Sequence, residues 1–341
     1  MEEARQVQYL TLRRWMICLL LFAFMVGGFA LLAVALGSTW IPPRQVFESL
    51  LSERGVTSVI VRDVRLPRVL LAGVVGGALA VAGVVFQALL RNPLADPFVL
   101  GVSGGAGLGA VIAVAFAGQI TVGGLAGMPI FAFAGALAAI VLVYLLAHTG
   151  GAVNLHTMLL AGVVTNAICS SAIMALTVTL SYDQLQTVIF WLMGHLSTMR
   201  MVSVGHLALY VLAGLAILLA IGRDLNQMSL GESQAAILGT NVEWTKRLAF
   251  LGASLITGGA VAASGIVGFV GLIVPHGMRL LVGPDHRILM PASFLGGAAF
   301  LMFADAVART VIAPTELPVG VITALIGGPA FLVLLIRRTR R

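Results

Sequence analysis

The stretch GGALAVAGVV at residues 76–85 returns as GGAVAASGIV at residues 258–267, with six of ten positions identical. Flanking identities at the same offset of 182 pair Arg65-Leu66 with Arg247-Leu248 and Pro93 with Pro275. Gly/Ala-rich helices match one another easily by chance, so the flanking identities carry more weight than the decapeptide. We interpret the two stretches as equivalent helices of an internal repeat.

The composition places the chain among polytopic helical membrane proteins. Of its 341 residues, 60% are hydrophobic and only 10% are charged, and the mean hydropathy is +1.06. Soluble domains of this length do not have such a composition. The 40 glycines suit closely packed transmembrane helices, in which small residues let backbones approach. Cys18 and Cys169 stand alone in apolar runs, so neither a disulfide framework nor a metal site is predicted.

Ten apolar runs are long enough to span a bilayer. They lie at 15–36, 66–90, 98–117, 122–147, 155–180, 203–222, 243–265, 266–283, 287–309 and 317–336. We therefore expect an all-α polytopic membrane protein with ten transmembrane helices in one domain, residues 1–341. The first repeat would cover about 15–180 and the second about 203–336. Because five spans is an odd number, the two copies cross in opposite directions, and inverted repeats are typical of transporters.

The distribution of basic residues orients the predicted spans. An inside N-terminus puts thirteen of the 20 Lys and Arg residues on the cytoplasmic side and seven outside. The positive-inside rule therefore favours cytoplasmic N- and C-termini. The run from Trp15 to Leu36 could instead be a signal peptide, but it is too long for a signal-peptide core and many spans follow it. The apolar stretch 187–196 is too short to span, and we expect it to lie across the outer face.

Several kinds of chemistry are excluded by what the sequence lacks. Lys246 is the only lysine and follows no glycine-rich loop, so the chain cannot itself be a P-loop ATPase. The six histidines show no metal-ligand spacing. A pathway for bare ions needs carboxylates or histidines at the bilayer midplane. The deepest acid, Asp305, has Arg309 four residues on, and an intrahelical pair explains it. The expected cargo is therefore a compound whose charge is already enclosed or internal, and which is large enough to need a wide path between helices.

The predicted outer face carries an unusual group of arginines. Arg62, Arg65 and Arg68 are spaced three apart and would share one face of a helix, and Arg309 would end a span on the same side. Snorkelling toward lipid headgroups is one explanation for each of them. As a cluster, they suit salt bridges to carboxylates on a soluble partner.

On the predicted inner face, SLGESQAAILG at 229–239 is a polar interruption too short to span. Ser229 and Glu232 match a capping box, and Gly239 supplies a helix stop. The residues between Ser229 and Gly239 span only about 14 Å as a helix. Such a helix could lie on lipid, but it lacks a basic face, so a protein groove suits it better. The nearby stretch RNPLADP at 91–97 breaks the chain between two spans.

Seven motifs resemble those of the FecCD-type permeases, the membrane subunits of ABC importers for iron–siderophore complexes, haem and cobalamin. In chain order they are RLPR (65–68), NPLADPFVLGVSGGAG (92–107), LGESQAAILG (230–239), GFVGLIVPHGMR (268–279), DHR (285–287), ADAVAR (304–309) and ELPVGVITALIGGP (316–329). The resemblance covers essentially the whole chain. It implies ten helices per subunit, a homodimer with the pathway at its interface, two cytoplasmic ABC ATPase subunits, and a periplasmic or lipid-anchored substrate-binding protein.

The resemblance also implies roles for individual residues. The ATPase-coupling helix would contain Ser229, Leu230, Gly231, Glu232, Ala235, Leu238 and Gly239. The residues that dock the binding protein would be Arg65, Arg68 and Arg309. The cytoplasmic gate would contain Asn92, Leu94, Leu155 and His156. No catalytic residue, metal ligand or cofactor is expected in this chain, because the partner ATPase would bind the ATP and Mg.

The function implied is that of a type II importer permease in the bacterial inner membrane, which moves its cargo by alternating access. The chain would not be an enzyme by itself and would have no nucleic-acid partner. A secondary, ion-coupled transporter with an inverted repeat remains an alternative and predicts ionisable residues at midplane. A structural membrane scaffold predicts no association with an ATPase. The sequence does not choose among iron–siderophore, haem and cobalamin as cargo.

Overall fold

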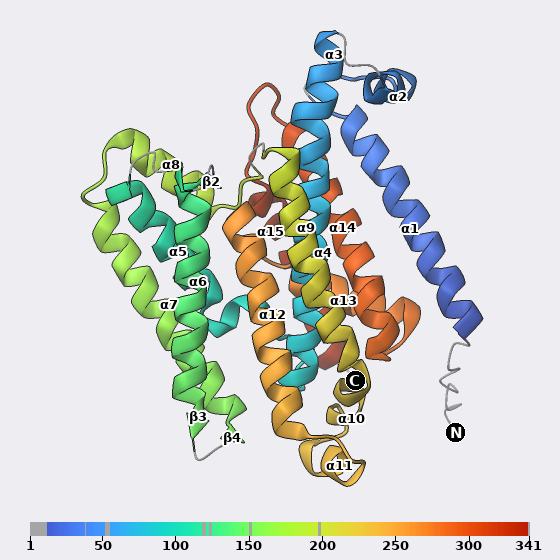
Figure 1. Cartoon of the computed structure of the whole chain (residues 1–341), viewed down its shortest axis with the longest axis vertical. Helices are drawn as coiled ribbons and strands as arrows, with labels where there is room; N and C mark the ends of the chain where they lie inside the picture. Colours follow the sequence, from blue (N-terminus) through green and yellow to red (C-terminus); the bar gives the residue numbers. More distant parts are fainter. Residues whose placement is uncertain are drawn as a thin grey trace.

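The computed structural model describes residues 12–37, 39–51, 55–117, 121–122, 125–149, 152–196 and 199–339. In this part of the chain, seven helices are long and apolar enough to cross a membrane (Figure 1). They are α1 (Leu12–Ala35), the continuous helix that ends as α4 (Leu66–Leu89), α6 (Gly127–Ala147), α7 (Leu155–Thr177), α9 (Met201–Ala220), α12 (Val242–Ser264) and α14 (His286–Thr310). The prediction of an all-helical membrane fold is confirmed at this level.

Three further apolar helices occupy the remaining predicted spans but are shorter in their apolar part. They are α5 (Val102–Ile112) with its π-helical extension η3 (Ala113–Ala117), α13 (Val270–Val282) and α15 (Val319–Thr339). The count of ten spans therefore stays a prediction. The division of the Gly-rich stretch 243–283 into two helices agrees with the structure, because Gly265 takes a left-handed backbone conformation with φ 68° after α12.

The predicted run 98–117 is not one helix. A 3-10 turn, η2 (Pro97–Leu100), comes first, and Gly101 with φ 87° separates it from α5. Proline starts the turn and glycine ends it, which is the usual asymmetry of a short helical segment.

Short elements join the long helices. The helices are α2 (Pro43–Leu51), α3 (Val56–Val59), the π-helical η1 (Ile60–Arg65), α8 (Tyr182–Leu192), α10 (Gly222–Met228) and α11 (Glu232–Ile237). Two antiparallel pairs of two-residue strands are β1 (Thr121–Val122) with β2 (Leu125–Ala126), and β3 (His148–Thr149) with β4 (Ala152–Val153). The stretch 187–196, expected not to span, falls largely in α8, which has only 11 residues.

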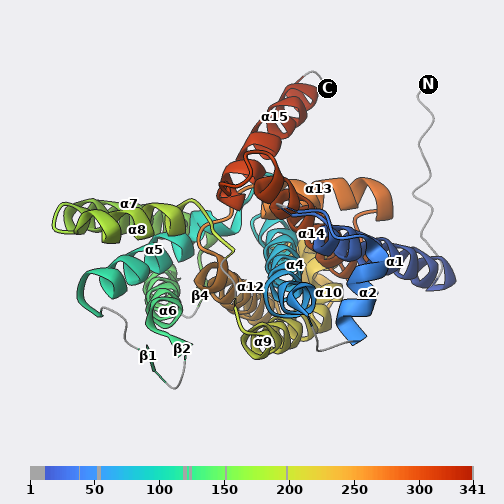
Figure 2. The ribbon, with the colours of Figure 1, turned by 90° about the horizontal axis from the view of Figure 1, so that it is seen from above.

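The core surrounds α4. The apolar window of the helix that ends as α4 is 89% buried, whereas the windows of α7 and α1 are 17% and 11% buried. A Cβ atom at Gly76 would collide with the carbonyl oxygen of Gly297, so α4 and α14 touch backbone to backbone. In Figure 2, α5, α6, α7 and α8 group on one side of α4, and α1 with α2 lies on the other.

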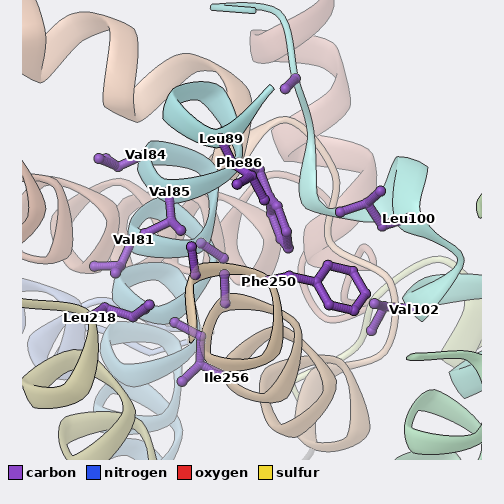
Figure 3. Packing of buried hydrophobic residues seen from close by; sticks show 14 of the residues in the cluster. Val81, Val84, Val85, Phe86, Leu89, Leu100, Val102, Leu218, Phe250 and Ile256 are labelled. Atoms are coloured by element: carbon purple, nitrogen blue, oxygen red, sulfur yellow. The ribbon is translucent and has the colours of Figure 1, made fainter. Parts of the chain in front are cut away.

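The two decapeptide copies lie in α4 and at the end of α12, which pack together and run in opposite directions (Figure 1). Between them, Phe86 of α4 and Phe250 of α12 are fully buried, with Leu100 and Val102 beside them (Figure 3). The opposed directions are those that an inverted repeat requires.

Candidate functional site

The helix predicted within 229–239 is present as α11, at the end of the bundle where α10 leads toward α12 (Figure 1). It is shorter than expected, with six residues, and the predicted capping box is wrong. Ser229 ends α10, and its hydroxyl donates to the carbonyl of Asn226. Gly231, with φ 120°, takes the N-cap position instead. The predicted stop is confirmed, because Gly239 has φ 90° and its N–H donates to Ala236 O at 3.0 Å.

One face of α11 is fixed to the bundle. Ala235 is fully buried, and its carbonyl accepts from the N–H of Thr240 at 3.0 Å. The Thr240 hydroxyl bonds the Gln227 side chain of α10. The Glu232 carboxylate contacts Lys246 Nζ of α12 at 2.6 Å. These contacts tie α11 to both neighbouring helices, so a force on α11 reaches both.

The other side of this turn presents apolar side chains. Ile237 is 85% exposed, and Leu230, Leu238 and Trp244 are also exposed. Gathered exposed apolar groups mark surfaces that bind a partner or a membrane. A short helix with apolar anchors is the kind of element that enters a groove on another protein.

α10 is anchored to the start of α14. The Asn226 side chain donates to Asp285 Oδ1 at 2.8 Å and accepts from the His286 N–H at 2.8 Å. Asp285 also contacts Arg287 Nη2 at 2.6 Å. Partial burial raises the pKa of Asp285, but the hydrogen bonds from Arg287 and Asn226 outweigh it and bring that pKa to about 2. Asp285 is therefore ionised at neutral pH, and its charged hydrogen bonds fix α10, the helix that precedes α11, to the start of α14.

The predicted gate residues lie in two loops. The Asn92 side chain accepts from the Leu94 N–H at 3.0 Å, which shapes the loop after α4. Leu155 is half-buried against the core, and His156 is exposed. Among the described residues, no hydrogen bond or ion pair joins Asn92 or Leu94 to Leu155 or His156, so the gate stays a prediction.

Asn154, which the sequence did not single out, caps the start of α7. Its side chain accepts from the N–H groups of His156 at 3.0 Å and Thr157 at 3.1 Å. An Asn before an apolar run is an N-cap signal, and it could have been found from the sequence.

The arginines predicted to dock a soluble partner are engaged inside the chain. Arg65 donates to the carbonyls of Val34, Ala35 and Thr39 at 2.7–3.0 Å. Both Arg65 and Arg68 are buried. Their proposed docking role is a separate matter, and it stays a prediction.

The Asp305 side chain contacts both Arg68 and Arg309. It contacts Arg309 Nε at 2.9 Å, which confirms the predicted intrahelical pair, and Arg68 Nε at 3.0 Å. Arg68 Nη1 also contacts Glu316 at 2.6 Å, and the Glu316 side chain is partly exposed. Arg309 donates to the carbonyls of Ala33 and Leu36 as well. This cluster links α1, α4 and α14 at the end of the bundle opposite α11 (Figure 1).

Comparisons with known proteins identify what the chain is similar to. The family model described as the FecCD transport family matches residues 19–337. The cobalamin import permease BtuC of Halobacterium salinarum is 46% identical, over 81% of this chain and 73% of its own length. The hemin transport permease HmuU of Yersinia pestis is 43% identical, over 81% of this chain and 83% of its own length. A structure described as an inward-facing ABC transporter of metal-chelate type superposes with a TM-score of 0.80 at 31% identity, covering 94% of this chain and 99% of that one.

Proposed function

Because the chain belongs to the FecCD transport family, we propose that a pair of copies forms the membrane pathway of a binding-protein-dependent ABC importer. The chain is the permease subunit, and ATP is hydrolysed on separate cytoplasmic subunits. The observation that carries this assignment is α11, a short helix fixed on one face and apolar on the other. Such a helix can transmit the movement of a soluble ATPase to the helices that it is fixed to.

The proposed cargo is an iron–siderophore complex, haem or cobalamin. The relatives BtuC and HmuU are named for cobalamin and hemin, and the superposed structure is described as of metal-chelate type. In all these compounds an organic framework already wraps the metal, so a largely apolar pathway is compatible with them.

The proposed arrangement has ten spans per chain, as an inverted five-helix repeat in one domain. The α11 end faces the cytoplasm, both termini lie on that side, and the protein resides in the bacterial inner membrane. The binding protein approaches the opposite end, where Glu316 is partly exposed beside Arg68. The loop at Asn92 and Leu94 and the start of α7 at Leu155 and His156 form the inner gate.

In the proposed cycle, ATP binding closes the ATPase dimer and moves the two α11 helices of the homodimer. This movement changes the angles of the helices around the central path, so that the path opens alternately to the two sides. The permease makes and breaks no bond of its cargo.

The test is reconstitution of the chain with its cognate ABC ATPase and binding protein in proteoliposomes. We expect ATP-dependent uptake of cyanocobalamin, haemin or a ferric siderophore, and ATPase activity that rises when the binding protein is added. Uptake that needs an ion gradient and no ATP would establish the ion-coupled alternative instead.

A substitution on α11 tests the observation itself. Ile237→Asp places a charge on the exposed apolar face and should weaken association with the ATPase on the order of 10-fold or more, because apolar anchors carry much of an interface's binding energy. Ile237→Leu is the matched control and should bind normally. Equal co-purification of the two variants would remove α11 as the coupling helix.

A further inference from the structure

Lys246 lies in the first turns of α12 and is the only lysine of the chain. It is only 4% exposed, although its ammonium group is charged. Burying a charge is costly unless the group is paired and hydrogen-bonded, so the surroundings of Lys246 need an explanation.

Three acceptors surround its ammonium group. Lys246 Nζ lies 2.6 Å from Glu232 of α11, 3.1 Å from Glu243 of α12 and 3.3 Å from the carbonyl oxygen of Val153 in β4. An ammonium group has three N–H donors, so each donor has one acceptor. Two of the acceptors are carboxylates, and without Lys246 their charges would repel each other. The side chain therefore joins three separate elements at one atom.

Both backbone polar groups of Val153, its carbonyl and its N–H, are hydrogen-bonded to side chains of α12. Its carbonyl accepts from Lys246, and its N–H donates to the Glu243 carboxylate at 2.8 Å. The next residue is Asn154, the N-cap of α7. A continuous path of polar contacts and one covalent step thus runs from Glu232 on α11 to the start of α7.

Aromatic packing supports the same junction from the other strand. His148 of β3 stacks on Tyr144 of α6 at 5.5 Å between ring centroids, and Tyr144 stacks on Phe250 of α12 at 6.1 Å. Phe250 lies one helical turn after Lys246, so both strands of the hairpin are fixed to the same part of α12.

We propose that Lys246 is a positioning residue that transmits the displacement of α11 to the start of α7. When α11 moves, the pair with Glu232 carries the movement to Lys246, and the contacts of Lys246 and Glu243 with Val153 carry it to the N-cap of α7. The inference rests on the proposed function, because it assigns to α7 the motion that the ATPase imposes on α11. A purely structural anchor would hold the same elements together without affecting how much cargo moves per ATP.

The test compares three variants in the reconstituted importer, with uptake and ATP hydrolysis measured in the same vesicles. Lys246→Met removes the ammonium group, and Glu232→Gln removes only the charge on α11. Lys246→Arg keeps a cation. We expect the ratio of cargo moved to ATP hydrolysed to fall on the order of 10-fold in Lys246→Met, the factor that the loss of a hydrogen bond to a charged group corresponds to. Glu232→Gln should lower it in the same direction, and Lys246→Arg should restore most of it.

Arg44→Met is the control, because it removes the positive charge of an exposed pair with Glu48 on α2, and the ratio should not change. A wild-type ratio in Lys246→Met, or uptake and ATP hydrolysis that fall in proportion, overturns the inference. If Lys246→Met does not fold, Glu232→Gln decides, because Lys246 keeps its contact with Glu243, and an unchanged ratio in that variant overturns the inference equally. Failure of the proposed function is distinguishable, since the wild-type complex would then show no ATP-dependent uptake.

Discussion

Asp305 has no exposed surface, and its carboxylate lies between Arg68 and Arg309 at 3.0 and 2.9 Å. Arg44 and Glu48, which lie four residues apart on α2, form an ion pair with the same spacing as Asp305 and Arg309, but their side chains are 89% and 60% exposed. Water screens the pair on α2, and the long side chains lose entropy when it forms, so it contributes little to stability. The buried Asp305 carboxylate pairs with two guanidinium groups that have little access to water. Loss of an ion pair should therefore cost more at the buried site than on α2.

Replacing Asp305 should therefore destabilise the protein far more than replacing Glu48. Asp305→Asn leaves two buried cations without their shared carboxylate and should lower the free energy of unfolding by about 3–5 kcal/mol. Glu48→Gln should change it by less than about 1 kcal/mol. Denaturant or thermal unfolding in detergent micelles measures both variants. Equal stability of the two would show that the buried cluster contributes no more than a surface pair.

At the residue scale, the sequence predicted local partners better than distant ones. The Asp305–Arg309 pair follows from helical spacing, and the structure contains it. The contact of Arg68 with Asp305 joins residues 237 positions apart, and no spacing rule reports such a pair. The capping box failed for another reason. Ser229 and Glu232 fit the pattern, but Ser229 is used to end α10 and its hydroxyl bonds backward.

At the element scale, α4 shows why this chain is rich in glycine. Gly76 of α4 and Gly297 of α14 each leave room for the other's carbonyl group, and a Cβ atom at either position would collide with it. Small residues at helix contacts in membranes let van der Waals packing and close backbone approach replace the missing hydrophobic force. The Gly/Ala-rich stretch predicted a closely packed helix, but its partner helix became known only from the structure.

A methyl group at Gly76 should therefore separate α4 from α14. We expect Gly76→Ala to lower the free energy of unfolding by about 1–3 kcal/mol, the usual cost of overpacking a filled core. Gly28→Ala on α1 is the matched control, because no atom outside the adjacent backbone of its own helix lies within 4 Å of the position its Cβ would take. There, alanine should be neutral or slightly stabilising through its higher helix propensity. Thermal unfolding of both variants in the same detergent makes the comparison, and a Gly76→Ala variant as stable as Gly28→Ala would contradict the close contact.

Helix boundaries were less predictable than the helices themselves. The hydropathy of residues 98–117 predicted one span, because a glycine at position 101 does not lower the hydropathy of the run. In the structure, the left-handed conformation of Gly101 divides this run into two helical segments. Likewise, 122–147 begins as a short hairpin, and the helix starts at Gly127. Hydropathy reports how apolar a segment is and carries little information about backbone direction.

At the scale of the whole molecule, the class of protein was predictable and its unpartnered surfaces were not. Composition and apolar runs predicted a helical membrane protein, and the motifs predicted the FecCD family that the family model matches. The structure adds that α4 is enclosed, whereas α7 exposes Leu160, Val163 and Ile168. A sequence cannot distinguish a helix face covered by lipid from one covered by a second copy, because both are apolar.

Because the only lysine of the chain is buried, chemical labelling of its amine can report whether the junction between α11 and α12 is closed. An enclosed amine is poorly accessible to amine-directed esters, so the native importer should gain almost no label at Lys246. Movement that separates α11 from α12 would uncover this amine, and the labelling rate would then measure how often the junction opens. Mass spectrometry of the fragment containing Lys246, with and without ATP, gives that rate. Fast labelling in the intact, resting complex would contradict the enclosed position. In a chain without a second lysine, every side-chain amine adduct reports on this one junction.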